Sequence, residues 1–276
     1  MSGAPSRPLS TGGIALIGGG RMASALAEGF CRAGLVTPDA ITVYDPAPAA
    51  CEAIAAGVPG VRFADTPAAA AATAEIVWLA VKPQQAAAAC GAIAGTMPGR
   101  TLVSILAGTS TTTLVSLAGT PRVIRVMPNT PCLVGRGVSV VCRTPEVPEA
   151  VATRVTALLA AVGHVHEADE SLINAVTGLS GSGPGFLALV VEALAAGGER
   201  AGLPRPLALA LAVQTLEGTG ALLERTGEEP AVIRDRVSSP GGTTLAGLAV
   251  LTQRGVPEAL AAAVEAAAAR AAELGR

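Results

Sequence analysis

The 276-residue chain has few aromatic and few charged residues, and each shortage excludes a class of function. Aromatic residues make up 2% and charged residues 14% of the sequence, and the formal net charge is −2. Nucleic-acid binding needs a basic excess and aromatic surfaces on which bases stack, so this class is excluded. Intrinsic disorder is excluded too, because hydrophobic residues reach 50% and can bury enough surface to offset the entropy of folding.

Lysine and cysteine are also scarce. Lys82 is the only lysine among 19 basic residues, so a mechanism that needs a lysine has one candidate. The five cysteines are scattered without a C-x-x-C pair, which predicts a reducing, cytoplasmic compartment. His164 and His166 lie two apart in a strand-like run, but no cluster of Cys or carboxylates completes a ligand set, and we expect no metal.

The chain also lacks long uninterrupted apolar runs. Mean hydropathy is positive, at +0.53. Gly, Pro or a charge nevertheless interrupts each run before the roughly 20 residues that cross a bilayer, and we expect a soluble protein that does not bind membranes. Residues 1–12 contain no apolar core of a secretory signal and are expected to form a short disordered lead.

Residues 13–168 alternate between apolar strand-like runs and alanine-rich helical stretches. This alternation predicts βαβ units, a mostly parallel sheet and an α/β dinucleotide-binding domain of the Rossmann type. The expected strands cover residues 14–18, 41–44, 61–63, 76–81, 101–105, 123–126 and 138–141. The expected helices cover residues 22–33 and 47–56, a stretch after Pro83, and the region near 111–117.

Residues 169–276 contain helical patterns and no convincing strand. Expected helices cover residues 186–201, 206–223, 230–236, 243–254 and 258–274. Segments such as 207–223 are apolar on more than one face, so other helices must cover them, plausibly those of a second chain. The sequence therefore predicts an all-α domain that builds a homodimer.

A glycine-rich turn follows the first expected strand. Residues 18–23 (GGGRMA) fit G-x-G-x-x-A, in which glycines let the backbone approach a pyrophosphate and helix N–H groups bind the anion. Asp45 ends the second strand, where a carboxylate usually bonds a ribose 2′-hydroxyl and favours NAD over NADP. Arg21 in the glycine turn favours a phosphate, and Asp45 can also be a turn residue, so the choice stays open.

Four later segments also have the chemistry of a binding site. Residues 80–83 (AVKP) place Lys82 at the carboxyl end of the fourth strand, and residues 125–131 (RVMPNTP) hold Asn129 between two prolines. Residues 178–185 (GLSGSGPG) predict either a glycine loop between helices or a close approach to a ligand. Residues 237–244 (VSSPGGTT) combine four hydroxyl groups with a helix start, which suits a carboxylate.

These segments, in this order, resemble the pyrroline-5-carboxylate reductase family from about residue 13 to 274. The most specific stretches are RVMPNTP, VTGLSGSGP (176–184) and VSSPGGTT. The resemblance implies a Rossmann domain followed by an interlocking helical domain, with many members forming decamers of five dimers. It also implies NADPH-dependent reduction of 1-pyrroline-5-carboxylate to L-proline, the last step of proline biosynthesis.

The resemblance further implies roles for individual residues. It assigns the cofactor to Gly18, Gly19, Gly20, Arg21, Met22, Ala80, Val81, Lys82, Pro83 and Asn129, and the substrate to Ser239, Gly242, Thr243 and Thr244. Lys82 and Thr244 are the catalytic candidates, with Thr244 or a bound water as the proton donor.

Two departures from the family pattern concern the cofactor. The family commonly has Asn before the fourth strand, where this chain has Asp65-Thr66-Pro67, and no Arg or Ser follows Asp45. Both leave NADH open beside NADPH. A β-hydroxyacid dehydrogenase is the first rival function, but the helix after residue 184 lacks the lysine of that chemistry. The second rival, a non-catalytic NAD(P)-binding regulator, would be expected to lose the hydroxyls of VSSPGGTT.

Overall fold

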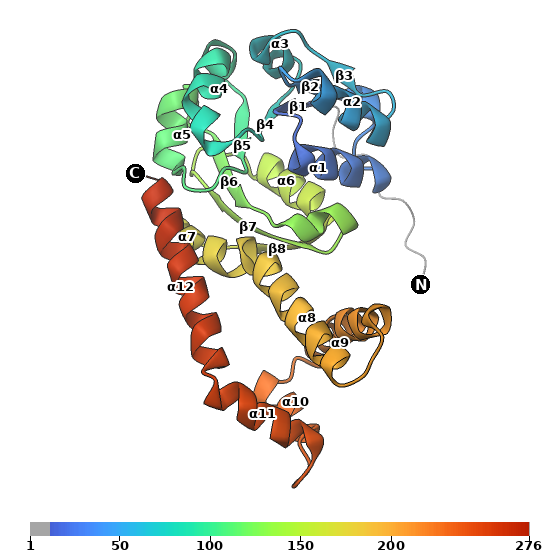
Figure 1. Ribbon diagram of the computed structural model, residues 1–276. Helices are drawn as coiled ribbons and strands as arrows, with labels where there is room; N and C mark the ends of the chain where they lie inside the picture. The colour runs from blue at the N-terminus through green and yellow to red at the C-terminus, as the bar shows by residue number, and fades with distance from the viewer. Residues whose placement is uncertain (1–11, 276) are drawn as a thin grey trace. The chain divides into compact units, whose positions relative to one another are not determined.

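The computed structural model describes residues 12–275, so most of the predicted disordered lead lies outside the described residues. By contacts the chain divides into two units (Figure 1). The first contains residues up to 181 together with the C-terminal residues from 267, and the second contains residues 182–266. The predicted domain boundary after residue 168 stays a prediction.

The first unit is built on one eight-stranded sheet of order β3-β2-β1-β4-β5-β6-β7-β8. All neighbouring strands pair in parallel except β6 and β7, which are antiparallel, so the mostly parallel Rossmann-type sheet is confirmed. The strands are β1 (Ile14–Ile17), β2 (Ile41–Tyr44), β3 (Arg62–Phe63), β4 (Ile76–Leu79), β5 (Thr101–Ser104), β6 (Val123–Met127), β7 (Gly137–Arg143) and β8 (Gly163–Glu167).

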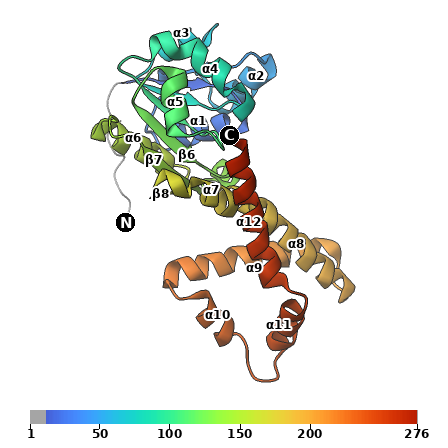
Figure 2. The ribbon, with the colours of Figure 1, turned by 90° about the vertical axis from the view of Figure 1, so that its left-hand side faces the viewer.

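Helices cover both faces of this sheet, because its central strands are apolar on both sides. One core packs α1 (Arg21–Arg32), α2 (Pro48–Gly57) and α6 (Glu149–Ala160) on the face that contains Trp78, whose ring lies 5.5 Å from Phe30. The other core packs α3 (Pro67–Ala72), α4 (Ala86–Ile93) and α5 (Thr111–Ala118) on the opposite face (Figure 2).

Two features differ from the sequence prediction. Helix α6 was not expected, and its formation depends on burial of Val151, Val155 and Leu158 against the sheet. For residues 178–185 the sequence left open a glycine loop between helices or a close approach to a ligand; the chain is helical there and forms no loop. The short α7 (Ile173–Val176) continues into a π-helical turn, Thr177–Gly181, and then into α8 (Gly183–Arg200).

The second unit is entirely helical, as predicted. It contains α8, α9 (Arg205–Thr226), α10 (Pro230–Arg236), α11 (Thr243–Gln253) and the first part of α12 (Val256–Leu274). Its buried core is small and centres on Ala195, Ala208 and Ala212. Many of its large apolar side chains are exposed in the single chain, among them Leu187, Leu189, Leu194, Leu207, Leu209, Leu211, Val213, Leu222, Val250 and Leu251.

Candidate active site

The glycine turn follows β1 at the carboxyl edge of the sheet. Gly18 has φ +104°, and its N–H donates to the Tyr44 carbonyl at 2.8 Å. An added Cβ there would lie 2.6 Å from the Ala80 carbonyl oxygen, so only glycine fits this position. Gly20 differs, because an added Cβ would meet no atom within 4 Å. The turn is therefore tight at Gly18 and open at Gly20.

Helix α1 begins directly after this open position. Gly20 is its N-cap residue, and no described side chain caps the helix start. The first N–H groups of α1 and the positive end of its dipole therefore face the space beside Gly20 and are suited to a pyrophosphate. This arrangement fits a dinucleotide, as the sequence motif predicts.

Asp45 organises the same turn. Its Oδ2 accepts a hydrogen bond from the Gly19 N–H at 2.7 Å, and its Oδ1 accepts one from the Ala47 N–H at 2.8 Å. The carboxylate is half-buried, and each oxygen keeps a lone pair for a further donor such as a ribose hydroxyl. Asp45 is therefore both a turn residue and a candidate cofactor ligand, so the two alternatives from the sequence are compatible.

A cavity of about 500 Å³ lies along these strand ends. It brings together six of the predicted cofactor residues, Gly18, Gly20, Asp45, Ala80, Val81 and Lys82. Sequence analysis missed the remaining lining residues, which include Tyr44, Pro67, Gln85, Ala88, Ala89 and Ala92. The spacing of Ala88, Ala89 and Ala92 places them on one face of α4. This pattern could have predicted that they line the cavity, because small side chains leave room for a flat ring.

Arg21 and Met22 lie beside a second hollow of about 620 Å³, lined also by Thr130, Pro131, Leu133 and Val134. Leu133 and Val134 are exposed, so this hollow has an apolar rim next to the glycine turn.

Lys82 follows β4, is exposed and lines the first cavity. Its backbone N–H donates to Gln85 Oε1 at 3.3 Å, which fixes the turn that Pro83 begins. The turn directs the chain from the strand into α4.

Asn129 follows β6 and is 8% exposed. Its Oδ1 accepts from the Val138 N–H at 2.8 Å, and its Nδ2 donates to the Ser180 carbonyl at 3.1 Å. The amide therefore joins the loop after β6 to β7 and to the π-helical turn. Asn129 and Pro83 are not among the residues that line either hollow.

The four predicted substrate residues lie in the second unit: Ser239 and Gly242 in the turn before α11, and Thr243 and Thr244 at the start of that helix. The Gly242 N–H donates to the Ser239 carbonyl at 2.9 Å, and a Cβ on Gly242 would overlap Ser239 Oγ. Ser239 and Thr243 are exposed and Thr244 is half-buried. Gly242 is the N-cap residue of α11, and no described side chain caps this helix start. The turn thus presents hydroxyls and free N–H groups to an anion.

The arginines beside this turn are engaged with carboxylates. Arg236 pairs with Glu228, whose hydrogen bond holds the pKa of Glu228 below its ordinary value, and Arg234 pairs with Asp235 at 3.1 Å. The donors that the turn offers to an anion are therefore hydroxyl and backbone N–H groups. Among the described residues, no group of three His, Cys, Asp or Glu can hold a metal ion.

Comparisons with known proteins match two separate parts of the chain. The family model described as "Pyrroline-5-carboxylate reductase dimerisation" matches residues 170–274, and "NADP oxidoreductase coenzyme F420-dependent" matches residues 13–108. Pyrroline-5-carboxylate reductase of Synechocystis sp. is 41% identical over 263 residues, covering 95% of this chain and 98% of the relative. The Arabidopsis thaliana reductase is 38% identical over 270 residues, covering 95% of each.

Solved structures give the same result. Plasmodium falciparum pyrroline carboxylate reductase with NADP bound superposes with a TM-score of 0.88 at 28% identity, covering 96% of this chain and 99% of that one. The pyrroline-5-carboxylate reductase of Coxiella burnetii also has a TM-score of 0.88, at 30% identity, covering 97% and 100%.

Proposed function

The chain belongs to the pyrroline-5-carboxylate reductase family, and we propose that its strand-end cavity binds the cofactor while the turn before α11 binds the substrate. The protein is an NAD(P)H-dependent oxidoreductase that reduces the C=N bond of 1-pyrroline-5-carboxylate, which gives L-proline in proline biosynthesis. The roles of individual residues that follow are parts of this proposal.

On the cofactor side, Gly18, Gly19, Gly20, Arg21 and Met22 hold the pyrophosphate. The open space at Gly20 and the uncapped start of α1 support this role. The nicotinamide is positioned by the turn after β4 and by Asn129. The residues of this turn are Ala80, Val81, Lys82 and Pro83. When bound, the reduced nicotinamide supplies the hydride. The protein orients the nicotinamide ring relative to the substrate and excludes unproductive orientations of the two.

On the substrate side, Ser239, Gly242, Thr243 and Thr244 hold the carboxylate and ring of the substrate. The hydroxyls and the start of α11 are neutral donors for a carboxylate. Thr244 donates a hydrogen bond that orients the ring nitrogen, and Thr244 or a bound water delivers the proton. Lys82 contributes positive charge at the cofactor, because its ammonium lies at the rim of the cavity.

Both cofactor forms have support. The Plasmodium falciparum relative has NADP bound, and Arg21 at the start of α1 suits an additional phosphate. The carboxylate of Asp45 lies at the end of β2, where it bonds a ribose 2′-hydroxyl and repels a 2′-phosphate. We propose that the enzyme uses NADPH and also accepts NADH.

The helical half makes a homodimer in this proposal. The match to the dimerisation model and the exposed leucines of α8 and α9 support it, as does the small core of the second unit. Residues 170–200 and α9 are long and apolar enough to cross a membrane by length and composition alone. A second copy of the chain explains the same apolar surface. The proposal includes the assembly of five dimers into a decamer and a cytoplasmic location. It includes no membrane partner and no nucleic-acid partner.

The proposal depends most on the open Gly20 position beside the uncapped start of α1. An absorbance assay tests the proposal: the oxidation of NADPH and of NADH is measured in the presence of 1-pyrroline-5-carboxylate. We expect substrate-dependent oxidation of at least one cofactor and formation of proline. Tight cofactor binding without oxidation would instead support the non-catalytic regulator. Oxidation of β-hydroxyacids coupled to reduction of NAD or NADP would support the dehydrogenase.

A further inference from the structure

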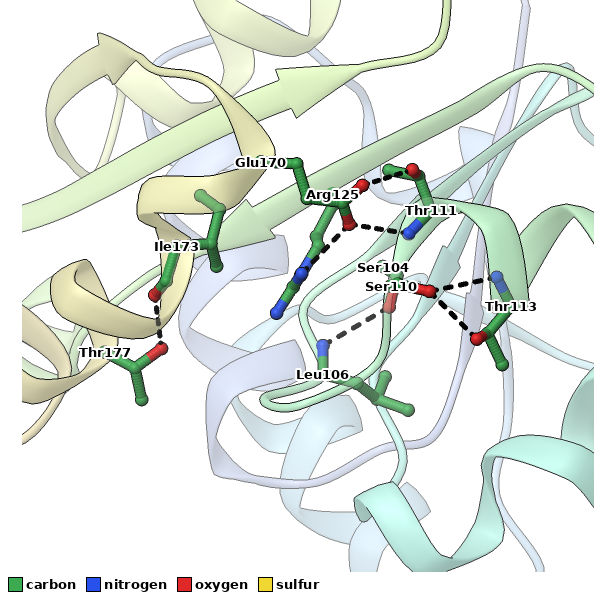
Figure 3. A network of polar contacts seen from close by, with 9 residues as sticks. All are labelled: Ser104, Leu106, Ser110, Thr111, Thr113, Arg125, Glu170, Ile173 and Thr177. Carbon is green, nitrogen blue, oxygen red and sulfur yellow. Dashed lines mark hydrogen bonds and ion pairs between the residues drawn. The ribbon is translucent and has the colours of Figure 1, made fainter. Parts of the chain in front are cut away.

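A polar network joins three separate segments of the first unit beneath the start of α5 (Figure 3). Glu170 Oε1 accepts hydrogen bonds from the Thr111 N–H at 2.7 Å and from Arg125 Nη1 at 3.0 Å. Its Oε2 accepts one from Thr111 Oγ1 at 2.5 Å. One carboxylate thus binds the N-terminus of a helix, a hydroxyl and a guanidinium.

Arg125 is the buried member of this network. Its side chain is 5% exposed, against 32% for that of Glu170. It lies on β6 between Ser104 of β5 and Cys142 of β7. Burial raises the pKa of Glu170, but hydrogen bonds from Thr111 and Arg125 outweigh it and leave the pKa below its ordinary value. A buried guanidinium without its carboxylate is strongly unfavourable, so Glu170 fixes its own segment to β6.

The segment that Glu170 begins ends at the π-helical turn. From Glu170 the chain passes through α7 to Thr177–Gly181, where the Asn129 amide donates to the Ser180 carbonyl. An added Cβ on Gly181 would lie 2.5 Å from Met127 Cε, so the turn also packs closely on the end of β6. Residues 170–181 are therefore fixed at both ends to β6 and the loop after it.

The π-helical form of the turn indicates that the position of this segment matters for function. Single π-helical turns are rare and occur frequently at functional sites. Here the turn directs the Ser180 carbonyl at Asn129. The other side of the Asn129 amide accepts a hydrogen bond from β7, so the turn and β7 together hold this side chain in place.

We propose that Glu170 is a positioning residue for the reduction, which holds the π-helical turn and thereby Asn129 at the nicotinamide side of the site. This rests on the proposed place of the nicotinamide beside Asn129. When a mutation misplaces the reacting groups by about 1 Å, the rate of the reaction falls on the order of 10²-fold. Loss of the Glu170 carboxylate therefore lowers kcat while the pyrophosphate site at Gly20 stays intact.

Steady-state kinetics and cofactor titration of four variants test this role. Glu170→Ala removes the network, and Glu170→Gln keeps its shape but leaves Arg125 with a neutral partner. Thr111→Val removes one hydrogen bond, and Asp169→Asn is the control, because this neighbouring carboxylate is exposed and outside the network. We expect kcat to fall about tenfold or more in Glu170→Ala, with smaller losses in Glu170→Gln and Thr111→Val.

The dissociation constant of NADPH, measured by fluorescence without turnover, should stay within about threefold of wild type in every variant. Asp169→Asn should retain wild-type kcat. A folded Glu170→Ala enzyme with wild-type kcat would overturn the positioning role, as would losses that match only the fraction of unfolded protein. If Glu170→Ala does not fold, wild-type kcat in both Glu170→Gln and Thr111→Val overturns it. Failure of the wild-type enzyme to reduce the substrate would overturn the proposed function instead.

Discussion

At the scale of single residues, Asp45 has a structural role in the glycine turn and a proposed role in cofactor specificity. Its two oxygens fix the N–H groups of Gly19 and Ala47, so the carboxylate is rigid at the mouth of the cavity. A rigid carboxylate binds a ribose hydroxyl with little loss of entropy and opposes a phosphate at the same place.

Replacement of Asp45 tests this specificity. Asp45→Ala should lower the ratio of kcat/KM for NADH to that for NADPH by about tenfold, because a hydrogen bond to a charged group is lost. Asp39→Ala is the matched control, because Asp39 is an exposed carboxylate that lies just before the first residue of β2, whereas Asp45 follows its last residue. An unchanged ratio in Asp45→Ala would show that the carboxylate serves the glycine turn alone.

The hydroxyls before and within α11 should differ in their kinetic roles. A threonine hydroxyl is too weak an acid to protonate an imine efficiently by itself, so we expect Thr244 to orient the ring nitrogen. Thr244→Ala should lower kcat by about 10²-fold or less. Ser239→Ala should act mainly on KM, since binding of the carboxylate changes little between ground state and transition state.

Steady-state kinetics with circular dichroism as the folding control measures both variants. Wild-type kcat and KM in folded Thr244→Ala would assign proton delivery and orientation to water and backbone amides.

At the scale of elements, the β1–α1 junction was predictable from sequence because its glycines have a local steric cause. Two other elements were not. Helix α6 combines four Ala and two Leu, which favour a helix, with two Val and two Thr of modest helix propensity, and burial against the sheet stabilises it. The glycines of residues 178–185 were compatible with a loop or with a close approach to a ligand, whereas hydrogen bonding by Asn129 and packing by Met127 favour a π-helical turn. Both depend on contacts distant in sequence.

Two glycines of the junction should respond differently to alanine. Gly18→Ala forces a side chain into a positive-φ conformation, which costs about 1–2 kcal/mol before its overlap with Ala80 is counted. It should lower the melting temperature. Gly20→Ala meets no atom of the protein, so it should melt like wild type but bind NADPH at least about tenfold more weakly. Calorimetry and cofactor titration measure the two effects. Wild-type NADPH affinity in Gly20→Ala would place the pyrophosphate elsewhere.

At the scale of the whole molecule, the sequence predicted the order of an α/β half and an all-α half from periodicity alone. That Gly18, Asp45 and Lys82 line one cavity could be predicted, because parallel strands bring their carboxyl ends to one edge of the sheet. The Glu170 network could not, since its three members lie far apart in sequence and no local pattern joins them.

In the proposed reaction, a hydride passes from a bound nicotinamide to the C=N carbon of 1-pyrroline-5-carboxylate. Mass spectrometry of the proline formed with NADPH or NADH doubly deuterated at C4 follows this transfer. We expect L-proline with one deuterium, on the ring carbon that formed the C=N bond. Proline without deuterium, or no proline while the deuterated cofactor is bound, would contradict it.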